Sequence, residues 1–290
     1  LIKILRNKKI NVIHMFHLYQ LGGITILTKK LFKKPVLTTL AGWDTYDPIR
    51  PVPKIIWPYM AWIMNNSEHV TTMCKHMYKS AKKQGAKKVE IIPHGTSMYK
   101  RKESEIDIKK KHSIGQNKKI IFSLQRLVPR KGLEYLIKSV PLVVKQVKNI
   151  VFLIGGKGPE LEKLVALAKK LKVEDKIIFA GFIAEEDLKS YYKKSTIFVL
   201  PSIYEGFGLV YLDSLANGLP IVTTNCGGPE DIIEKENGFL VPTRNSEEFA
   251  KAIISALKKK WNRKKIAFNT KKYSWNNIVK RYEQIYKQIT

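Results

Sequence analysis

Short runs of β-branched and apolar residues alternate with longer amphipathic segments along most of the chain, and this alternation constrains the fold most strongly. In the second half the runs read KKIIFSLQR, NIVFLIGG, DKIIFAGF, STIFVLPS, LPIVTTN and NGFLVPT, with helical stretches such as residues 132–147 and 159–171 between them. In the first part, NVIHMF, PVLTTLAG, HVTTMC and KVEIIP have the same character. Such repetition predicts parallel sheets, and therefore an α/β chain of two Rossmann-like domains that face each other across a cleft.

A charged segment poor in large apolar residues, between Lys100 and Asn117, predicts the boundary between these domains. We expect a first domain over residues 1–99, a second over residues 100–274, and an aromatic-rich amphipathic helix over residues 275–290 that crosses back to the first domain. The chain opens on Leu1 in what reads as the middle of a helix, so we expect the first domain to be truncated.

Composition excludes several classes of protein. A hydrophobic fraction of 44% is typical of a globular chain. Cys74 and Cys226 lie far apart without metal-ligand spacing, which argues against a disulfide framework or a zinc site and favours the cytoplasm. The longest apolar stretch, IIWPYMAWIM, is too short to span a membrane and contains a proline. His14 and His17 are spaced loosely like metal ligands but are more typical of a strand end, and we expect no metal.

The net charge of +29 leaves two interpretations open. Lysine outnumbers arginine by 45 to 8, whereas a nucleic-acid-binding protein is expected to use more arginine, and we expect no nucleic-acid partner. Residues 1–100 hold 17 basic and 4 acidic residues, a net charge of +13. This excess fits either a solvated, lysine-rich surface or attraction to an anionic membrane.

The loops that follow the strands of the second half are where function is expected, because parallel sheets bind ligands at the carboxyl ends of their strands. Arg126 and Lys131 follow IIFSLQ and place two cations where the next helix begins. The loop of residues 155–160 lacks the third glycine of the dinucleotide fingerprint, so a nicotinamide cofactor is not indicated.

The stretch PSIYEGFGLVYLDSLANGLPIV carries two acids, Glu205 in a glycine-flanked turn and Asp213 within an apolar run. A helix that starts near Gly206 or Phe207 would aim backbone N–H groups at an anionic ligand. Arg126 and Lys131 could bind a diphosphate, Glu205 could accept hydrogen bonds from sugar hydroxyls, and Asp213 could bind a ribose. Together these residues predict a nucleotide-sugar site.

The motifs RLVPRKGLEYLIKSV, FLIGGKGPELEKL, IIFAGFIAEEDLKSYY, VLPSIYEGFGLVYLDSLANGLPIV and NCGGPEDII appear in this order. With them the chain resembles the retaining family-4 glycosyltransferases of the GT-B fold over essentially its whole length. The resemblance implies that Arg126 and Lys131 bind the donor diphosphate, that Glu205 contacts the transferred sugar and that Asp213 holds the ribose. It also assigns sugar and phosphate contacts to the amides of Gly206, Phe207, Gly208 and Leu209, nucleobase contacts to Gly181, Phe182 and Ile183, and an acceptor-side turn to Gly42 and Asp44.

Three departures from the family pattern stand out. Asp213 occupies the position of the second of two paired glutamates, Ala41 stands where the family often has a histidine, and the family's first βα units are absent.

The function that the resemblance implies is transfer of a hexosyl group from a nucleoside diphosphate sugar to a glycan or lipid-linked acceptor, as in polysaccharide biosynthesis. Transfer with retention would proceed by front-face attack and without a metal or other cofactor, in the cytoplasm or peripherally at the inner face of the membrane. The alternative is a truncated or non-catalytic protein that binds nucleotide sugars.

Overall fold

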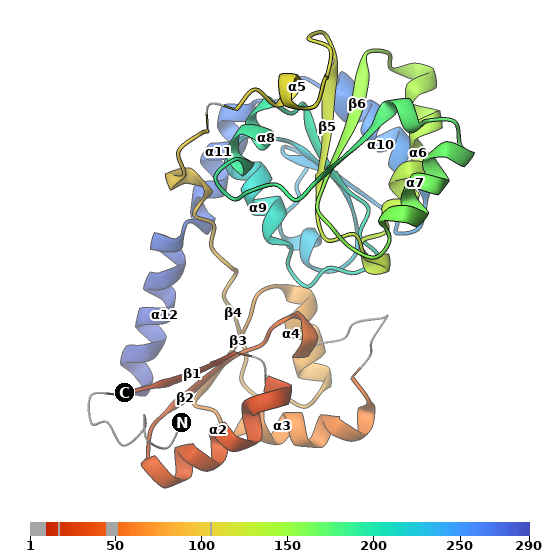
Figure 1. The fold of residues 1–290 in the computed structure, drawn as a ribbon. Helices are drawn as coiled ribbons and strands as arrows, with labels where there is room; N and C mark the ends of the chain where they lie inside the picture. The colour runs from red at the N-terminus through yellow and green to blue at the C-terminus, as the bar shows by residue number, and fades with distance from the viewer. Residues whose placement is uncertain (1–9, 17, 45–51, 105) are drawn as a thin grey trace. The chain divides into compact units, whose positions relative to one another are not determined.

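The computed structural model describes residues 10–16, 18–44, 52–104 and 106–290, and contacts divide the chain into two units. The first unit comprises Leu1–Gly95, Glu205–Phe207 and Trp275–Thr290, and the second comprises Thr96–Tyr204 and Gly208–Ser274. Each unit contains one parallel sheet (Figure 1). The α/β fold class predicted from the alternating runs is therefore confirmed. Within the described ranges, no helix is both long enough and apolar enough to cross a membrane.

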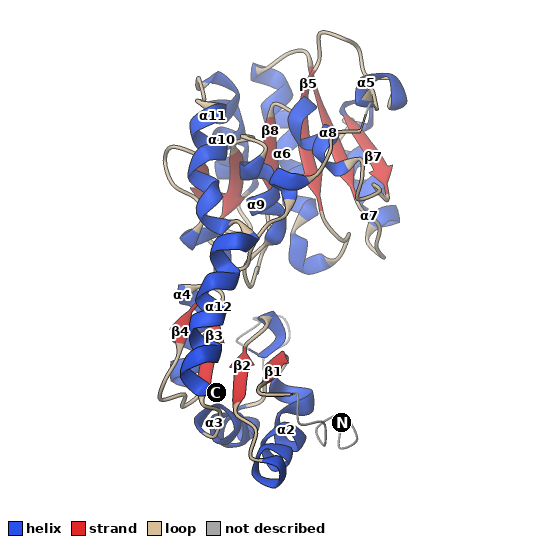
Figure 2. Ribbon diagram, turned by 90° about the vertical axis from the view of Figure 1, so that its left-hand side faces the viewer, coloured by secondary structure: helices blue, strands red, loops and turns tan. Residues whose placement is uncertain are grey.

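The first unit is built on a four-stranded sheet in the order β1-β2-β3-β4. Its strands are β1 (Ile13–Phe16), β2 (Val36–Thr39), β3 (His69–Thr72) and β4 (Glu90–Ile91), and its helices are α2 (Leu18–Phe32), α3 (Trp57–Asn65), α4 (Lys75–Lys83) and α12 (Trp275–Ile289). All four residues of β2 are buried, as expected for an inner strand covered on both faces. Helix α12 runs along this sheet (Figure 2) and packs Ile278 and Ile285 against Leu37 and Ile92.

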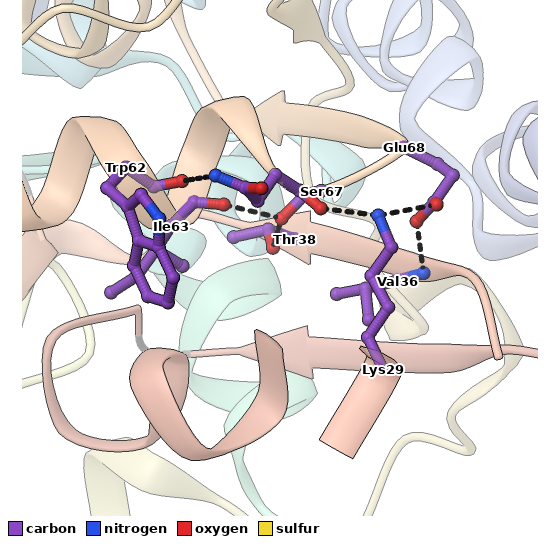
Figure 3. A network of polar contacts seen from close by, with 8 residues as sticks. Lys29, Val36, Thr38, Trp62, Ile63, Ser67 and Glu68 are labelled. Atoms are coloured by element: carbon purple, nitrogen blue, oxygen red, sulfur yellow. Dashed lines mark hydrogen bonds and ion pairs between the residues drawn. The ribbon is translucent and has the colours of Figure 1, made fainter. Parts of the chain in front are cut away.

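A polar network ties α2, β2 and the end of α3 together (Figure 3). One carboxylate oxygen of Glu68 lies 2.6 Å from the ammonium nitrogen of Lys29, and the other accepts a hydrogen bond of 2.6 Å from the Val36 amide. The hydroxyl groups of Thr38 and Ser67 are 2.7 Å apart. The network thus gives a hydrogen-bond acceptor to the amide of Val36, the first residue of β2, where the chain enters the buried sheet.

The second unit is built on a six-stranded sheet in the order β10-β9-β8-β5-β6-β7. Its strands are β5 (Lys119–Leu124), β6 (Ile150–Gly155), β7 (Ile177–Gly181), β8 (Ile197–Leu200), β9 (Ile221–Thr224) and β10 (Gly238–Val241). Its helices are α5 (Ile108–Lys111), α6 (Leu133–Gln146), α7 (Leu161–Lys170), α8 (Leu188–Lys194), α9 (Leu209–Ala216), α10 (Ser246–Lys258) and α11 (Arg263–Thr270). Helices α6, α7 and α10 cover one face of the sheet, and α8, α9 and α11 cover the other (Figure 1). Every residue of β6 is buried, which explains its continuous apolar sequence.

Candidate functional site

The strand order of the second unit reverses between β5 and β8. Strand β5 pairs with β6 on one side and with β8 on the other, although β8 follows β7 in the chain. In open parallel sheets ligands bind outside the carboxyl ends of the strands at such a reversal. The loops that begin at Gln125 and at Pro201 therefore mark the candidate site.

The loops at this edge of the sheet are joined to one another by backbone hydrogen bonds. The Ile203 amide donates to the Arg130 carbonyl (2.9 Å), the Leu127 amide to the Lys157 carbonyl (3.0 Å) and the Gly156 amide to the Gly181 carbonyl (2.7 Å). The loops after β5, β6, β7 and β8 thus form one continuous rim, which suits a site that must hold its groups in fixed positions.

Two glycines allow the rim loops to approach this closely. A Cβ atom on Gly132 (φ +64°) would lie 2.1 Å from the Pro201 carbonyl oxygen, and one on Gly156 (φ +121°) would lie 1.8 Å from the Gln125 carbonyl oxygen. Any other residue would both clash with a backbone carbonyl and adopt an unfavourable φ.

The two predicted cations lie on the loop after β5. Arg126 is exposed, and the partly buried Lys131 ends a 3₁₀ turn in which its amide donates to the Val128 carbonyl (3.0 Å). Helix α9 starts at Leu209, not near Gly206 or Phe207 as predicted. The later start follows from Gly208, which adopts the left-handed conformation (φ +86°) and so precedes the first helical residue.

Asp213 has a protein partner. Its Oδ1 accepts a hydrogen bond of 2.7 Å from the Thr96 hydroxyl, and the Thr96 hydroxyl oxygen accepts one of 3.1 Å from the Met98 amide. The Thr96 amide donates to the Tyr273 carbonyl (2.8 Å), and Thr96 forms a parallel bridge with Ser274. The carboxylate is therefore tied to the point where the chain enters and leaves the second unit, and its ribose contact stays a prediction.

The predicted nucleobase loop divides into an exposed part and a buried part. Phe182 is 72% exposed, and a Cβ atom on Gly181 (φ +67°) would meet no atom within 4 Å. Ile183 is buried and packs so closely on Gly155 that a Cβ there would lie 2.5 Å from its Cδ1. The Phe182 ring and the open space at Gly181 are accessible to a ligand, whereas the Ile183 side chain belongs to the core.

Gln125 is a candidate that the sequence reasoning missed. It is buried at the carboxyl end of β5, and its Nε2 has no hydrogen-bond partner among the described residues. The Ser123 hydroxyl lies 2.6 Å from the Val199 carbonyl oxygen and 3.0 Å from Gln125 Oε1. One hydroxyl proton cannot serve both oxygens, and the carbonyl can only accept, so the amide fits better with Nε2 toward Ser123.

In either orientation one buried amide atom of Gln125 lacks a described partner at the strand reversal. Such an atom is expected to meet a ligand or water. The available sequence signal was a polar residue directly after a buried strand.

Asp44, predicted on the acceptor side, lies within the first unit. It is 1% exposed, and its Oδ2 accepts a hydrogen bond of 2.9 Å from the Ala41 amide, which closes the 3₁₀ turn Gly42–Asp44. Its carboxylate therefore stabilises the turn.

Glu205–Phe207 is grouped with the first unit. Glu205 and Phe207 are buried, and a Cβ atom on Gly206 would lie 3.2 Å from the Gly42 Cα. The structure thus brings together Gly206 and Gly42, two glycines that the sequence assigned to different parts of the site.

Neither cysteine of the chain takes part in a disulfide, and both are buried. Within the part of the chain that the structure describes, no three His, Cys, Asp or Glu side chains are grouped as metal ligands.

Comparison with known proteins identifies related families over nearly the whole chain. The family model "Glycosyl transferases group 1" matches residues 104–273, and "Glycosyltransferase Family 4" matches residues 1–98. An uncharacterized glycosyltransferase of Methanocaldococcus jannaschii is 33% identical over 211 residues, which are 69% of this chain and 54% of the relative. The alpha-monoglucosyldiacylglycerol synthase of Streptococcus pneumoniae is 27% identical over 76% of this chain and 47% of its own.

Solved structures share the fold at low sequence identity. Anabaena HepE, crystallised with UDP and glucose, superposes with a TM-score of 0.82 at 18% identity over 99% of this chain and 81% of its own. A glycosyltransferase of Rickettsia africae superposes with a TM-score of 0.84 at 20% identity, over 99% and 79% of the two chains. This chain spans about half the length of the curated relatives that it matches.

Proposed function

The chain belongs to the group 1 glycosyltransferases, and we propose that it moves a hexosyl group, with retention, from a nucleoside diphosphate sugar to a glycan or lipid-linked acceptor. The observation that carries the proposal is the strand reversal of the second unit. There the exposed Arg126, Lys131 and the start of α9 follow the carboxyl ends of β5 and β8.

A leaving diphosphate needs positive charge where its oxygens develop negative charge. Arg126 can bind two phosphate oxygens at once through its planar guanidinium, Lys131 adds a point charge, and the amides at the start of α9 add hydrogen-bond donors. These groups together can stabilise the departing phosphate without a metal ion. We assign the transferred sugar to Glu205 and the Gly206–Leu209 amides, the ribose to Asp213, and the nucleobase to Phe182 and the backbone at Gly181 and Ile183.

Retention is proposed to follow front-face attack, in which the acceptor hydroxyl approaches from the side of the leaving phosphate. In this mechanism the departing phosphate oxygen takes the acceptor proton, and the cations beside it hold the separated charges. No covalent intermediate on a carboxylate is required. The acceptor would be held by the first unit, with Gly42 and Asp44 in the turn that follows β2.

Donor binding tests the assignment directly. UDP-glucose and GDP-mannose are titrated separately by calorimetry against the wild type, Arg126→Ala and Lys131→Ala. Each variant should bind the preferred donor about ten- to a hundredfold more weakly, because a charge-assisted contact with the diphosphate is lost. Lys145→Ala is the matched control, because this exposed lysine lies in the last turn of α6, at the other end of the helix from the rim, and its loss should leave affinity unchanged.

Glu205→Gln separates sugar contact from diphosphate binding. If Glu205 contacts the transferred hexose, the variant should retain UDP or GDP affinity but lose affinity for the intact sugar donor. Two results together would contradict the site assignment: unchanged affinity for the sugar donor in Glu205→Gln, and unchanged affinity for donor and nucleotide in Lys131→Ala.

Metal independence is tested by EDTA. Saturating chelator should leave donor binding and hexosyl transfer unchanged, because the cationic side chains replace the metal in this proposal. Restoration of lost activity by Mg²⁺ or Mn²⁺ would contradict it.

A non-catalytic role in nucleotide-sugar binding is the second candidate, favoured by Ala41, which stands where the family often has a histidine. In that case the chain binds the donor but transfers no sugar to any acceptor tested. Transfer or donor hydrolysis by the 290-residue chain excludes this role.

We also propose a cytoplasmic location, peripheral at the inner face of the membrane. The net charge of +13 over residues 1–100 favours anionic headgroups, and exposed apolar side chains on α2 and around α3 can enter the interface. These side chains are Leu21, Ile24, Leu27, Leu31, Ile55, Tyr59 and Trp62.

Sedimentation with vesicles tests this location. The wild type should bind phosphatidylglycerol vesicles in preference to phosphatidylcholine vesicles. Ile24→Asp should weaken this binding, whereas Leu161→Asp, at an exposed leucine of α7, should not. Equal binding to both kinds of vesicle counts against the proposal.

A further inference from the structure

The first unit contains a cavity of about 350 Å³ that the site described above does not use. It lies at the carboxyl ends of three strands, because its lining includes Phe16 at the end of β1, Met73 after β3 and residues 92–94 after β4. Helix α12 lines the other side. The position is the one at which parallel sheets bind ligands, and the volume is within the usual range of ligand cavities, roughly 300–1,000 Å³.

The lining is aromatic and carries no lysine, arginine or carboxylate. Six of its eleven residues have aromatic rings, and α12 contributes three of these rings, Trp275, Tyr282 and Tyr286. Charged residues make up 27% of the chain, and its net charge is +29, so a neutral cavity differs from its surroundings. The lining offers no Lys, Arg, Asp or Glu side chain to pair with a charged ligand, which favours a neutral one.

Polar groups are spaced among the rings. The Tyr286 hydroxyl lies 2.6 Å from His14 Nδ1, and His14 Nε2 lies 2.7 Å from the Thr39 hydroxyl. A neutral imidazole carries one N–H, so one of the two partners donates to the ring and the other accepts. In both arrangements the Tyr286 oxygen keeps a lone pair that can accept from a ligand hydroxyl.

His94 and Tyr282 add two further groups. His94 Nδ1 lies 2.7 Å from the Gly95 carbonyl oxygen, which can only accept, so in the neutral ring Nδ1 carries the proton and Nε2 is an acceptor. The Tyr282 hydroxyl makes no hydrogen bond to another described residue. The cavity therefore combines flat apolar faces with uncharged donors and acceptors.

A pyranose ring has matching chemistry. Its C–H faces are apolar and can pack on aromatic rings, while its hydroxyl groups point outward along the edge and need hydrogen-bond partners. We propose that this aromatic cavity binds a neutral sugar residue of the acceptor. Only the identification of this sugar as part of the acceptor rests on the proposed function. Binding of a neutral sugar to the cavity can be measured without a donor and without turnover.

Calorimetry on the full chain without nucleotide tests the cavity itself. Maltose and methyl α-D-mannopyranoside serve as neutral probes, and methyl β-D-glucuronide serves as an anionic probe. At least one neutral probe should bind saturably, with a Kd on the order of 1 mM. The glucuronide should bind more weakly, because its carboxylate would enter a cavity without a counter-charge.

Two substitutions on α12 test the location. Val279 lines the cavity and is 42% exposed, so Val279→Trp should fill the space without disturbing the core and should weaken probe binding more than tenfold. Glu283→Trp places the same side chain at an exposed position of α12 outside the lining and is the matched control. Tyr282→Phe keeps the ring and should weaken binding roughly three- to tenfold through the loss of one hydrogen bond. Unchanged thermal unfolding shows that each variant is folded.

Three outcomes would overturn the inference. The first two are no saturable binding of either neutral probe and equal probe affinity in wild type and Val279→Trp. The third is binding of 1-octanol but not of the sugars, which would assign the cavity to an acyl chain. Failure here with normal UDP- or GDP-sugar binding leaves the proposed function intact. Sugar binding without any nucleotide-sugar binding would support the cavity and refute the proposed function.

Discussion

Protonation of His14 should destabilise the first unit as the pH falls from about 6.5 to about 4. Burial removes water from the imidazole and lowers the pKa of His14 from 6.5 to about 4 in the folded chain. Between these values the unfolded chain binds a proton that the folded chain does not, so stability is fully present above pH 6.5 and is lost as the pH falls toward 4. Below about pH 4 both states are protonated and the loss stops.

The size of the effect follows from the two pKa values. A difference of about 2.5 pH units corresponds to about 3.4 kcal/mol for a fully desolvated group. His14 is only partly buried, and solvent screening reduces the expected loss to about 1–2 kcal/mol. A protonated ring must donate from both nitrogens, so the hydroxyl of Tyr286 or Thr39 that donates to the neutral ring has to turn and accept instead.

An NMR titration of the His14 ring protons measures the folded pKa without assuming two-state unfolding. Urea unfolding at pH 4.5, 5.5, 6.5 and 7.5 then compares wild type with His14→Gln, which cannot titrate. Burial and the neighbouring Lys111 also lower the pKa of His112, but His112 is present in both proteins and cancels in the difference. A His14 midpoint above pH 6, or a wild-type-minus-variant stability that does not change with pH, would refute the reasoning.

Three further predictions concern the rim, the nucleobase loop and the polar network. Gly156→Ala should destabilise the second unit by about 3 kcal/mol or more, because the added methyl group meets a backbone carbonyl. Gly181→Ala should destabilise it by about 1 kcal/mol, because only the positive φ is unfavourable there. Thermal unfolding compares the two variants. Phe182→Ala should weaken donor binding roughly five- to a hundredfold through lost stacking and leave the melting temperature unchanged, because the ring is mostly exposed; equal donor affinity would count against nucleobase contact. Glu68→Gln should cost about 1–2 kcal/mol in urea unfolding by removing the ion pair with Lys29, and an unchanged midpoint would show that solvent screens this pair fully.

Local sequence patterns were sufficient to predict the sheet elements. Each of the ten apolar runs contains a strand, because strands buried on both faces need continuous β-branched and apolar residues. The positions of Arg126 and Lys131 after β5 followed from the same rule, since a residue directly after a parallel strand lies at its carboxyl end.

Partners distant in sequence could not be predicted in this way. The hydrogen bond between Asp213 and Thr96 joins residues 117 positions apart, and nothing in either local sequence specifies it. Burial of Ile183 next to the exposed Phe182 depends on the packing of β6 against β7. The start of α9 depends on the backbone conformation of Gly208, which a glycine permits but does not require.

The bridge between Thr96 and Ser274 has a consequence for how the chain can be divided. In the order of the chain, the whole second unit lies between Gly95 and Trp275 of the first. The two ends of this insertion are hydrogen-bonded to each other. An inserted domain whose ends adjoin can be excised or circularly permuted with little strain on its host. Residues 96–274 are therefore the natural segment to express alone, and joining Thr96 to Ser274 through a short linker, with new termini in an exposed loop, should preserve its six-stranded sheet.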